Sequence, residues 1–256
     1  MKNTVLVLTS ILLSLTLLVS CGGEVVQEPL EQTEVVEEIE AATQQLEPMS
    51  ILFVGNSFVF FGSLTGQLQD ILYVNGIDIT YMDISVGGAT LTSHAENAKY
   101  QMRARQFDFV VLQDQSQRPL NDLDGFLNDV SRLGAVAEET GATLVLYNPA
   151  WPNIDLIPDE ETQNLLTAAY MRAAEENNAI LVNAGDAWVF AYGLRPDLDL
   201  YHEDAFHANY DGAFFTAAVF AATLYDIEFT NVPQYEDASI ELLEDLVQIA
   251  WDFVNR

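Results

Sequence analysis

Three polar motifs, far apart in this chain, hold the residue types that acyl transfer requires. A Gly-Asn-Ser triplet stands at 55–57 after the apolar run 51–54, a Gly-Gly pair stands at 87–88, and Asp204 and His207 lie in one segment near the C-terminus. A serine hydroxyl is a weak nucleophile until a base takes its proton, and a third group must orient that base. Asp204 and His207 supply a carboxylate and a base from one loop. The histidines of the chain are His94, His202 and His207, so few other bases compete.

Each motif also has a purely structural interpretation. Ser57 suits the N-cap of a helix, because a helical pattern begins soon after it. The pair at 87–88 suits a turn that requires a positive φ. Val59 stands where a Gly-X-Ser-X-Gly elbow would need its second glycine, so the chain lacks the nucleophile motif of the α/β-hydrolases. For His94 a surface or packing role is expected, and His202, which lies beside acidic residues, is the competing base.

The sequence between the motifs predicts strands that alternate with helices. Continuous apolar runs predict strands at 50–54, 77–84, 107–112, 142–147 and 179–182. Helical spacing of apolar residues predicts helices at 64–74, 92–105, 123–139, 162–177 and 210–224, and a final helix with an apolar stripe from Ile240 to Val254. Such alternation implies right-handed crossovers and a mainly parallel α/β sheet covered on both faces.

The polar motifs are expected to meet at one edge of this sheet. Ser57 follows the first predicted strand, Gly88 the second, and the polar segment from Gln113 to Gln117 the third. Ligands of open parallel sheets bind outside the carboxyl ends of the strands. The convergence of three motifs on this edge is stronger support for a site than any one of them.

This order of motifs resembles the SGNH/GDSL hydrolase family, and in particular bacterial members with Gly-Asn-Ser-Phe around the nucleophile, here residues 55–58. The resemblance covers roughly residues 50–226. It implies a flavodoxin-like three-layer α/β/α sandwich, placed here at 49–256, and ester hydrolysis through a serine acyl-enzyme. No His-X-X-X-His, Cys-X-X-Cys or phosphate-loop pattern occurs, so we expect neither a metal nor a cofactor.

The resemblance also implies a role for each motif. Ser57 is the expected nucleophile, His207 the base and Asp204 the residue that orients it. The backbone N–H groups of Ser57 and Gly88 are the expected oxyanion donors, with Gly87 as the alternative to Gly88.

The third block departs from the family. The family has Gly-X-Asn-Asp there, and its asparagine amide completes the oxyanion hole, whereas this chain reads Leu-Gln-Asp-Gln-Ser-Gln at 112–117. A glutamine amide offers the same N–H donors on a longer stem. Gln115 is the predicted donor, Gln113 the alternative, and Gln117 the position found by ungapped counting. A polar loop without any role in catalysis is the competing interpretation.

The N-terminus predicts export and lipid anchoring. Lys2 precedes an apolar run from Val5 to Val19, which is typical of a secretory signal peptide and falls short of the ~20 residues of a membrane span. The segment ends in a bacterial lipobox before Cys21, which is the only cysteine of the chain. We therefore predict a lipoprotein signal peptide at 1–20, acylation of Cys21 and a lipid-anchored protein of the bacterial cell envelope that faces the periplasm or the exterior.

Residues 21–48 are predicted to form an acidic, flexible tether. They include eight glutamates and neither a basic nor an aromatic residue. A short amphipathic helical turn within them is the alternative.

The strong negative charge of the chain limits the classes of molecule that it is expected to bind. The sequence has 39 acidic and 9 basic residues and a formal net charge of −30. Such a field disfavours nucleic acid and anionic substrates. The expected substrate is a small-molecule or carbohydrate ester, acetyl esters first, and the expected membrane contact is the lipid on Cys21. The aromatic residues Tyr147, Trp151, Trp188 and Tyr192 suit sugar stacking or core packing equally.

Two other functions compete with the esterase. One is a phospholipase or thioesterase with the same triad, and the other is a non-catalytic, surface-exposed binding lipoprotein with this fold.

Overall fold

The structure is a computed structural model that describes residues 48–152, 155, 157–226, 229–236 and 238–256. The predicted signal peptide at 1–20, Cys21 and all but the last residue of the tether at 21–48 lie outside this part of the chain. Within it, no helix is both long enough and apolar enough to cross a membrane.

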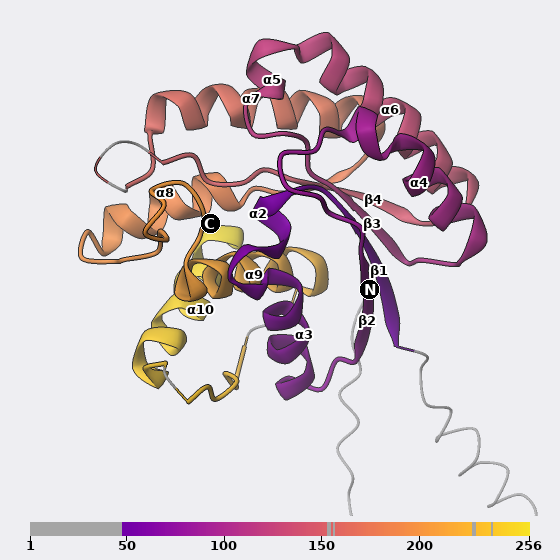
Figure 1. The fold of residues 1–256 in the computed structure, drawn as a ribbon. Helices are drawn as coiled ribbons and strands as arrows, with labels where there is room; N and C mark the ends of the chain where they lie inside the picture. The colour runs from indigo at the N-terminus through magenta and orange to yellow at the C-terminus, as the bar shows by residue number, and fades with distance from the viewer. Residues whose placement is uncertain (1–47, 153–154, 156, 227–228, 237) are drawn as a thin grey trace, which may run out of the picture. The chain divides into compact units, whose positions relative to one another are not determined.

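Five parallel strands form one sheet in the order β2-β1-β3-β4-β5. They are β1 (Met49–Val54), β2 (Ile79–Asp83), β3 (Phe109–Leu112), β4 (Thr143–Tyr147) and β5 (Ile180–Val182). This order is that of flavodoxin-like sheets, in which the chain reverses its direction of growth between β1 and β3. The predicted parallel three-layer α/β/α sandwich is confirmed (Figure 1).

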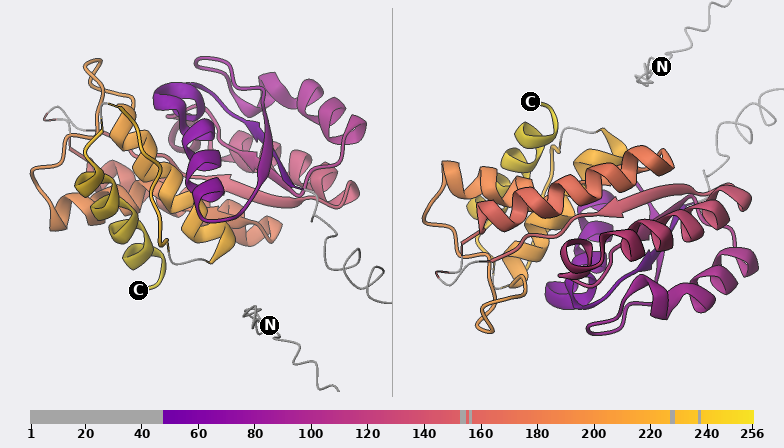
Figure 2. Two further views of the ribbon diagram at one scale, coloured as in Figure 1. Left: turned by 90° about the horizontal axis from the view of Figure 1, so that it is seen from below. Right: turned by 90° about the horizontal axis from the view of Figure 1, so that it is seen from above.

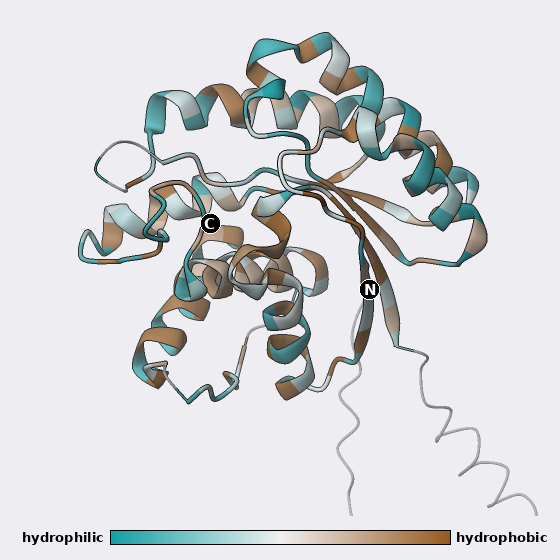
Figure 3. Ribbon diagram, viewed as in Figure 1, coloured by the Kyte–Doolittle hydropathy of each residue, from teal (hydrophilic) through white to brown (hydrophobic). Residues whose placement is uncertain are grey.

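Alternate residues of β1, β3 and β4 pack into two separate hydrophobic cores. In β1, Ile51 and Phe53 enter one core, whereas Leu52 and Val54 enter the other. Because successive side chains of a strand point to opposite faces, a strand buried on both faces must be apolar at every position. This explains the uninterrupted apolar runs in the sequence, which appear as brown strands in the middle of Figure 3.

Helices cover both faces of the sheet (Figures 1 and 2). One face carries α3 (Leu64–Val74), α8 (Ala184–Leu194), α9 (Tyr210–Tyr225) and α10 (Ile240–Val254). The other carries α4 (Leu91–Ala104), α6 (Leu123–Glu139) and α7 (Glu160–Asn177). Short helical turns, α2 (Ser57–Phe60), η1 (Phe61–Ser63) and α5 (Arg118–Asn121), follow the carboxyl ends of β1 and β3.

The sequence did not predict helix α8, and two of the aromatic residues considered for sugar stacking lie on this helix. Trp188 and Tyr192 were expected near strand ends, as possible sugar-stacking residues. Both lie on α8 and are buried, with the Trp188 indole donating a hydrogen bond to Thr216 Oγ1 at 3.0 Å. Tyr147 is buried as well. Of the four aromatic residues considered for sugar stacking, only Trp151 is partly exposed.

Candidate active site

Ser57, His207 and Asp204 form a continuous hydrogen-bonded chain. Ser57 is the first residue of α2, which begins after Gly55 and Asn56 at the end of β1, and its Oγ lies 2.7 Å from His207 Nε2. His207 Nδ1 lies 2.6 Å from Asp204 Oδ2. A carboxylate only accepts hydrogen bonds, so Nδ1 carries the hydrogen and Nε2 presents its lone pair to the Ser57 hydroxyl. The three residues predicted to act together are therefore brought together in the arrangement that a serine nucleophile requires.

Asp204 and His207 belong to one small closed loop. An antiparallel bridge between Tyr201 and Ala208 closes this loop, and the His202 N–H donates to the His207 carbonyl at 2.7 Å. Inside it, Asp204 Oδ1 accepts from the N–H groups of Phe206 and His207, each at 3.0 Å. Burial acts to raise the pKa of Asp204, but hydrogen bonds from the His207 backbone, the His207 ring and the Phe206 backbone outweigh it and lower the pKa to about 2. Asp204 is thus ionised at neutral pH.

Aromatic rings surround the imidazole. The Phe61 ring stacks on His207 with a centroid distance of 4.0 Å and an interplanar angle of 12°. Phe206 meets the imidazole edge-on at 5.0 Å, and Trp151 meets Phe206 edge-on at 5.5 Å. His202, the competing base, is half exposed and packs against Phe61, with no contact to Ser57 among the described interactions. Of these two histidines, His207 is therefore the one that contacts Ser57 in the described part of the chain.

Two backbone N–H groups of the loops at this edge, those of Ser57 and Gly88, have no hydrogen-bond acceptor among the described residues. Ser57 is the first residue of a helical turn, so its N–H points out of the helix. The other N–H belongs to Gly88, at the third position of a turn closed by Ala89 N–H donating to Val86 O at 3.0 Å. Gly88 has a φ of 68°, which a glycine adopts without strain.

Asn56 ties the three loops at the carboxyl edge together. Its Nδ2 donates to the carbonyls of Ala89 at 3.2 Å and Asp114 at 3.0 Å, and its Oδ1 accepts from the Phe58 N–H. The Val86 N–H donates to Gly55 O at 3.2 Å, so both ends of the Gly88 turn are bonded to the Gly55–Asn56 segment. This fixes the position of the Gly88 N–H relative to that of Ser57.

No model of a protein family matches this sequence, and no curated protein is similar to it. Several solved structures are similar in fold to this chain. A proposed SGNH hydrolase from Slackia heliotrinireducens is 22% identical with a TM-score of 0.59, covering 69% of this chain and 99% of that one. A catalytic mutant of Axe2, an acetylxylan esterase from Geobacillus stearothermophilus, is 15% identical with a TM-score of 0.59, covering 73% and 97%. The chain has the SGNH hydrolase fold.

A further similar structure is a DUF4886 family protein from Bacteroides uniformis. It is 15% identical with a TM-score of 0.67, and the match covers 82% of this chain and 95% of that one.

The third loop of this SGNH fold separates the two glutamines that were considered as oxyanion donors. Gln113 is buried, its Oε1 accepts from the Asn56 N–H at 3.0 Å, and its Nε2 donates to the Asp114 carbonyl. Both ends of the Gln113 amide are therefore bonded to backbone groups, those of Asn56 and Asp114. Gln115 is partly buried, and it bonds only within its own loop, to Ser116 Oγ at 3.0 Å and from the Gln117 N–H at 3.0 Å.

An ion-pair network underlies this loop and was missed by the sequence reasoning. Arg118 Nη1 lies 2.9 Å from Asp114 Oδ2 and 2.8 Å from Asp129 Oδ2. Asp114 is completely buried, and its Oδ1 accepts from the N–H groups of Leu91 and Gln115. Burial raises the pKa of Asp114, while these hydrogen bonds and Arg118 act against the shift. The sequence signal was an arginine four residues after an aspartate in a loop, which is too common to be specific.

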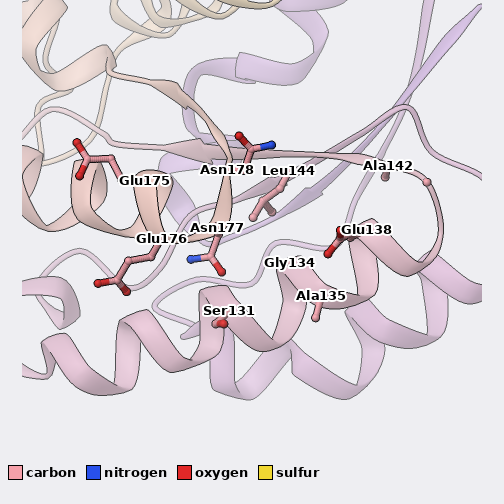
Figure 4. A pocket seen from close by; sticks show the side chains of 11 residues that line it. Ser131, Gly134, Ala135, Glu138, Ala142, Leu144, Glu175, Glu176, Asn177 and Asn178 are labelled. Carbon is pink, nitrogen blue, oxygen red and sulfur yellow. The ribbon is translucent and has the colours of Figure 1, made fainter.

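A hollow at the opposite edge of the sheet lies far from the triad in the chain order of its lining residues. It has a volume of about 600 Å³ and lies between the C-terminal ends of α6 and α7 and the start of β4 (Figure 4). Its charged side chains are Glu138, Glu175 and Glu176, and its one serine, Ser131, has no histidine beside it among the lining residues. The chemistry of the triad therefore belongs to the carboxyl edge and not to this hollow.

Proposed function

We propose that the protein is a serine ester hydrolase and that Ser57, His207 and Asp204 are its catalytic triad. The unbroken chain of contacts from Ser57 Oγ through His207 to Asp204, at 2.7 Å and 2.6 Å, is the observation that supports this proposal most directly. The N–H groups of Ser57 and Gly88, which have no acceptor among the described residues and belong to loops joined through Asn56, are the proposed donors to an oxyanion. The SGNH fold is consistent with it, since the similar chains include an acetylxylan esterase.

In the proposed acylation step, Ser57 Oγ attacks the carbonyl carbon of the ester while its proton moves to His207 Nε2. The carbonyl π electrons move to the oxygen, and the N–H groups of Ser57 and Gly88 donate to this oxyanion. When the tetrahedral intermediate collapses, the bond from carbon to the alcohol oxygen breaks. His207 then gives its proton to the departing alcohol, which leaves the acyl group on Ser57.

Deacylation repeats these steps with water. His207 takes a proton from the water, the water oxygen adds to the acyl carbon, and the bond to Ser57 Oγ breaks as His207 returns the proton to the serine. The products are a carboxylic acid and the restored hydroxyl. The ionised Asp204 stabilises the imidazolium that forms in both halves of the reaction.

We propose an uncharged, short-chain ester, acetyl esters first, as the substrate class, with carbohydrate esters included. In the described loops 55–63, 84–90, 113–122 and 199–209, Arg118 is the one lysine or arginine. It is paired with Asp114, Asp122 and Asp129 and has 13% of its side chain exposed, so it is committed to the loop itself. These loops offer no free cation to an anionic headgroup or acyl carrier. The partly exposed Trp151 and the neighbouring Phe206 are suited to pack against a sugar or another ring.

A panel of p-nitrophenyl esters of increasing acyl length tests this function. We expect activity that is highest on acetate and lost in Ser57→Ala, whose thermal unfolding should match that of the wild type. More than a few per cent of wild-type activity in Ser57→Ala would exclude Ser57 as the nucleophile. A maximum at long chains would favour a lipase-like enzyme, and no hydrolysis by a folded wild type would favour a binding protein.

We also propose that the enzyme is a lipoprotein of the bacterial envelope. The lipobox before Cys21 and the acidic segment at 21–48 support an acylated N-terminus from which the hydrolase domain extends. On this proposal the substrate is met outside the cytoplasm.

A further inference from the structure

The peptide unit between Gly55 and Asn56 is held at both of its ends by buried side chains. Its carbonyl oxygen, on Gly55, lies 2.7 Å from His94 Nε2 and also accepts from the Val86 N–H at the longer distance of 3.2 Å, and its N–H, on Asn56, donates to Gln113 Oε1 at 3.0 Å. A carbonyl oxygen only accepts, so His94 Nε2 carries a hydrogen here. His94 and Gln113 are 5% and 1% exposed, so water does not compete for either bond.

Rotation of this peptide unit would break bonds on both sides at once. The C=O and N–H groups of a planar trans peptide point in opposite directions, so a turn of the plane moves both away from their partners. Gly55 itself is closely packed, because a Cβ at this position would lie 2.6 Å from Val59 Cγ2 and 2.8 Å from Gln113 Oε1. Gly55 is thus packed directly against the side chain that fixes the next amide.

The locked unit determines where the next N–H points. The Asn56 carbonyl accepts from the Val59 N–H at 2.9 Å, and the Ser57 N–H, on the other side of the same peptide plane, is left without a partner among the described residues. Asn56 cannot turn, since its own side chain is bonded to Ala89, Asp114 and Phe58. The direction of the Ser57 N–H therefore depends on the peptide unit that precedes it.

We propose that His94 and Gln113 are positioning residues that hold the Gly55–Asn56 peptide so that the Ser57 N–H points at the oxyanion. This inference rests on the proposed ester hydrolysis. Among the described interactions, His94 and Gln113 have no hydrogen bond to the side chains of Ser57, His207 or Asp204. They act through the backbone, which replaces the expectation of a packing role for His94 and of a direct donor role for Gln113.

The test compares His94→Met, which removes the donor in a similar volume, with His94→Gln, whose amide reaches the position of Nε2. A misplacement of about 1 Å at a reacting centre costs about 10²-fold in rate. We expect His94→Met to lower kcat about 30–100-fold with KM changed less than about threefold, because the oxyanion bond forms in the transition state. His94→Gln should keep kcat within about fivefold of the wild type.

Gln113→Met removes the acceptor for the Asn56 N–H and should reproduce the kcat loss. Thr167→Val is the matched control, because Thr167 Oγ1, on α7, accepts a buried hydrogen bond from Asn148, which follows β4, and donates one to Asp186 in the first turn of α8. It should lower the melting temperature but leave kcat unchanged. An unchanged kcat in folded His94→Met, or an equal loss in His94→Gln, would overturn the proposal.

The proposed function and this inference fail in different ways. Wild-type protein and Ser57→Ala, assayed together, test the function itself. The ¹⁵N–¹H resonance of Ser57 tests the positioning without any turnover. It should shift and broaden in His94→Met and Gln113→Met and stay at its wild-type position in His94→Gln and Thr167→Val. A Ser57 resonance that His94→Met leaves unchanged would refute the role of His94, whatever the activity of the wild type.

Discussion

Replacing Asp204 by asparagine separates the charge of this residue from its structural contacts. The N–H groups of Phe206 and His207 donate to Oδ1, which an asparagine retains, so the loop should keep its shape. What changes is the group facing His207 Nδ1 at 2.6 Å. An amide there donates, so Nδ1 must become the acceptor and the hydrogen moves to Nε2. In that tautomer His207 can no longer take the proton of Ser57.

The expected loss in Asp204→Asn is about 10³–10⁴ in kcat, or about 4–5.5 kcal/mol in the barrier. A carboxylate 2.6 Å from an imidazolium nitrogen is worth about 6 kcal/mol at an effective dielectric constant of about 20. Because 35% of the Asp204 side chain is exposed, solvent screening lowers this figure toward the expected range.

Hydrolysis of p-nitrophenyl acetate, followed with thermal unfolding, measures the effect of Asp204→Asn. Glu203→Gln is the matched control, since it removes a neighbouring exposed charge from the same loop and should leave kcat within about twofold. Retention of more than about a tenth of the wild-type kcat in Asp204→Asn would refute the assigned role. An equal loss in Glu203→Gln would show that the enzyme senses the general field of the loop and not the Asp204 carboxylate.

Three further predictions follow from the same structure. We predict that the Gln115 amide leaves Ser116 and completes the oxyanion hole, so Gln115→Ala should lower kcat by about 10²–10³ with little change in KM. An unchanged kcat would leave the oxyanion hole to the N–H groups of Ser57 and Gly88 alone. The stabilising effect of the ionised Asp204 should be complete above the ordinary aspartate pKa of 3.8 and should disappear as the pH falls toward about 2. The melting temperatures of the wild type and Asp204→Asn should therefore converge between these two pH values. A melting-temperature difference that stays constant there would contradict the lowered pKa. Cys21→Ser should release the expressed protein from the detergent phase or stall its processing, whereas equal membrane retention of both forms would contradict lipid anchoring.

Much of the fold could be predicted because its strands are buried on both faces. Apolar runs such as Ile51–Val54 mark a central parallel strand, and α3 and α6 begin and end at the predicted residues. Helix α8 was missed, because it lies among other elements and buries Ala184, Ala187, Trp188 and Ala191, which leaves no clear polar face to reveal its period. Short turns such as α2 are too brief for any periodic signal.

The residues of the candidate site could be predicted only where they belong to a short sequence motif. Asp204 and His207 are three residues apart, so their pairing could be predicted from the sequence. Ser57 could be predicted because it comes soon after the first predicted strand. The buried contacts of His94 and Gln113 could not be predicted, because a bond from a side chain to a backbone carbonyl or N–H 39 or 57 residues away leaves no pattern in the sequence. Such contacts depend on the register of the strands, which single-sequence reasoning does not provide.

The closed loop between Tyr201 and Ala208 divides the assembly of the site into a local and a long-range part. The base and its orienting carboxylate are joined by contacts within a few residues, so their pairing closes only a short stretch of chain and costs little entropy. The contact of His207 with Ser57 spans 150 residues and forms only when β1 and α9 have found their places. Mutations that loosen the sheet should therefore separate an intact Asp204–His207 pair from its nucleophile, and activity would be lost before the pair itself is disrupted.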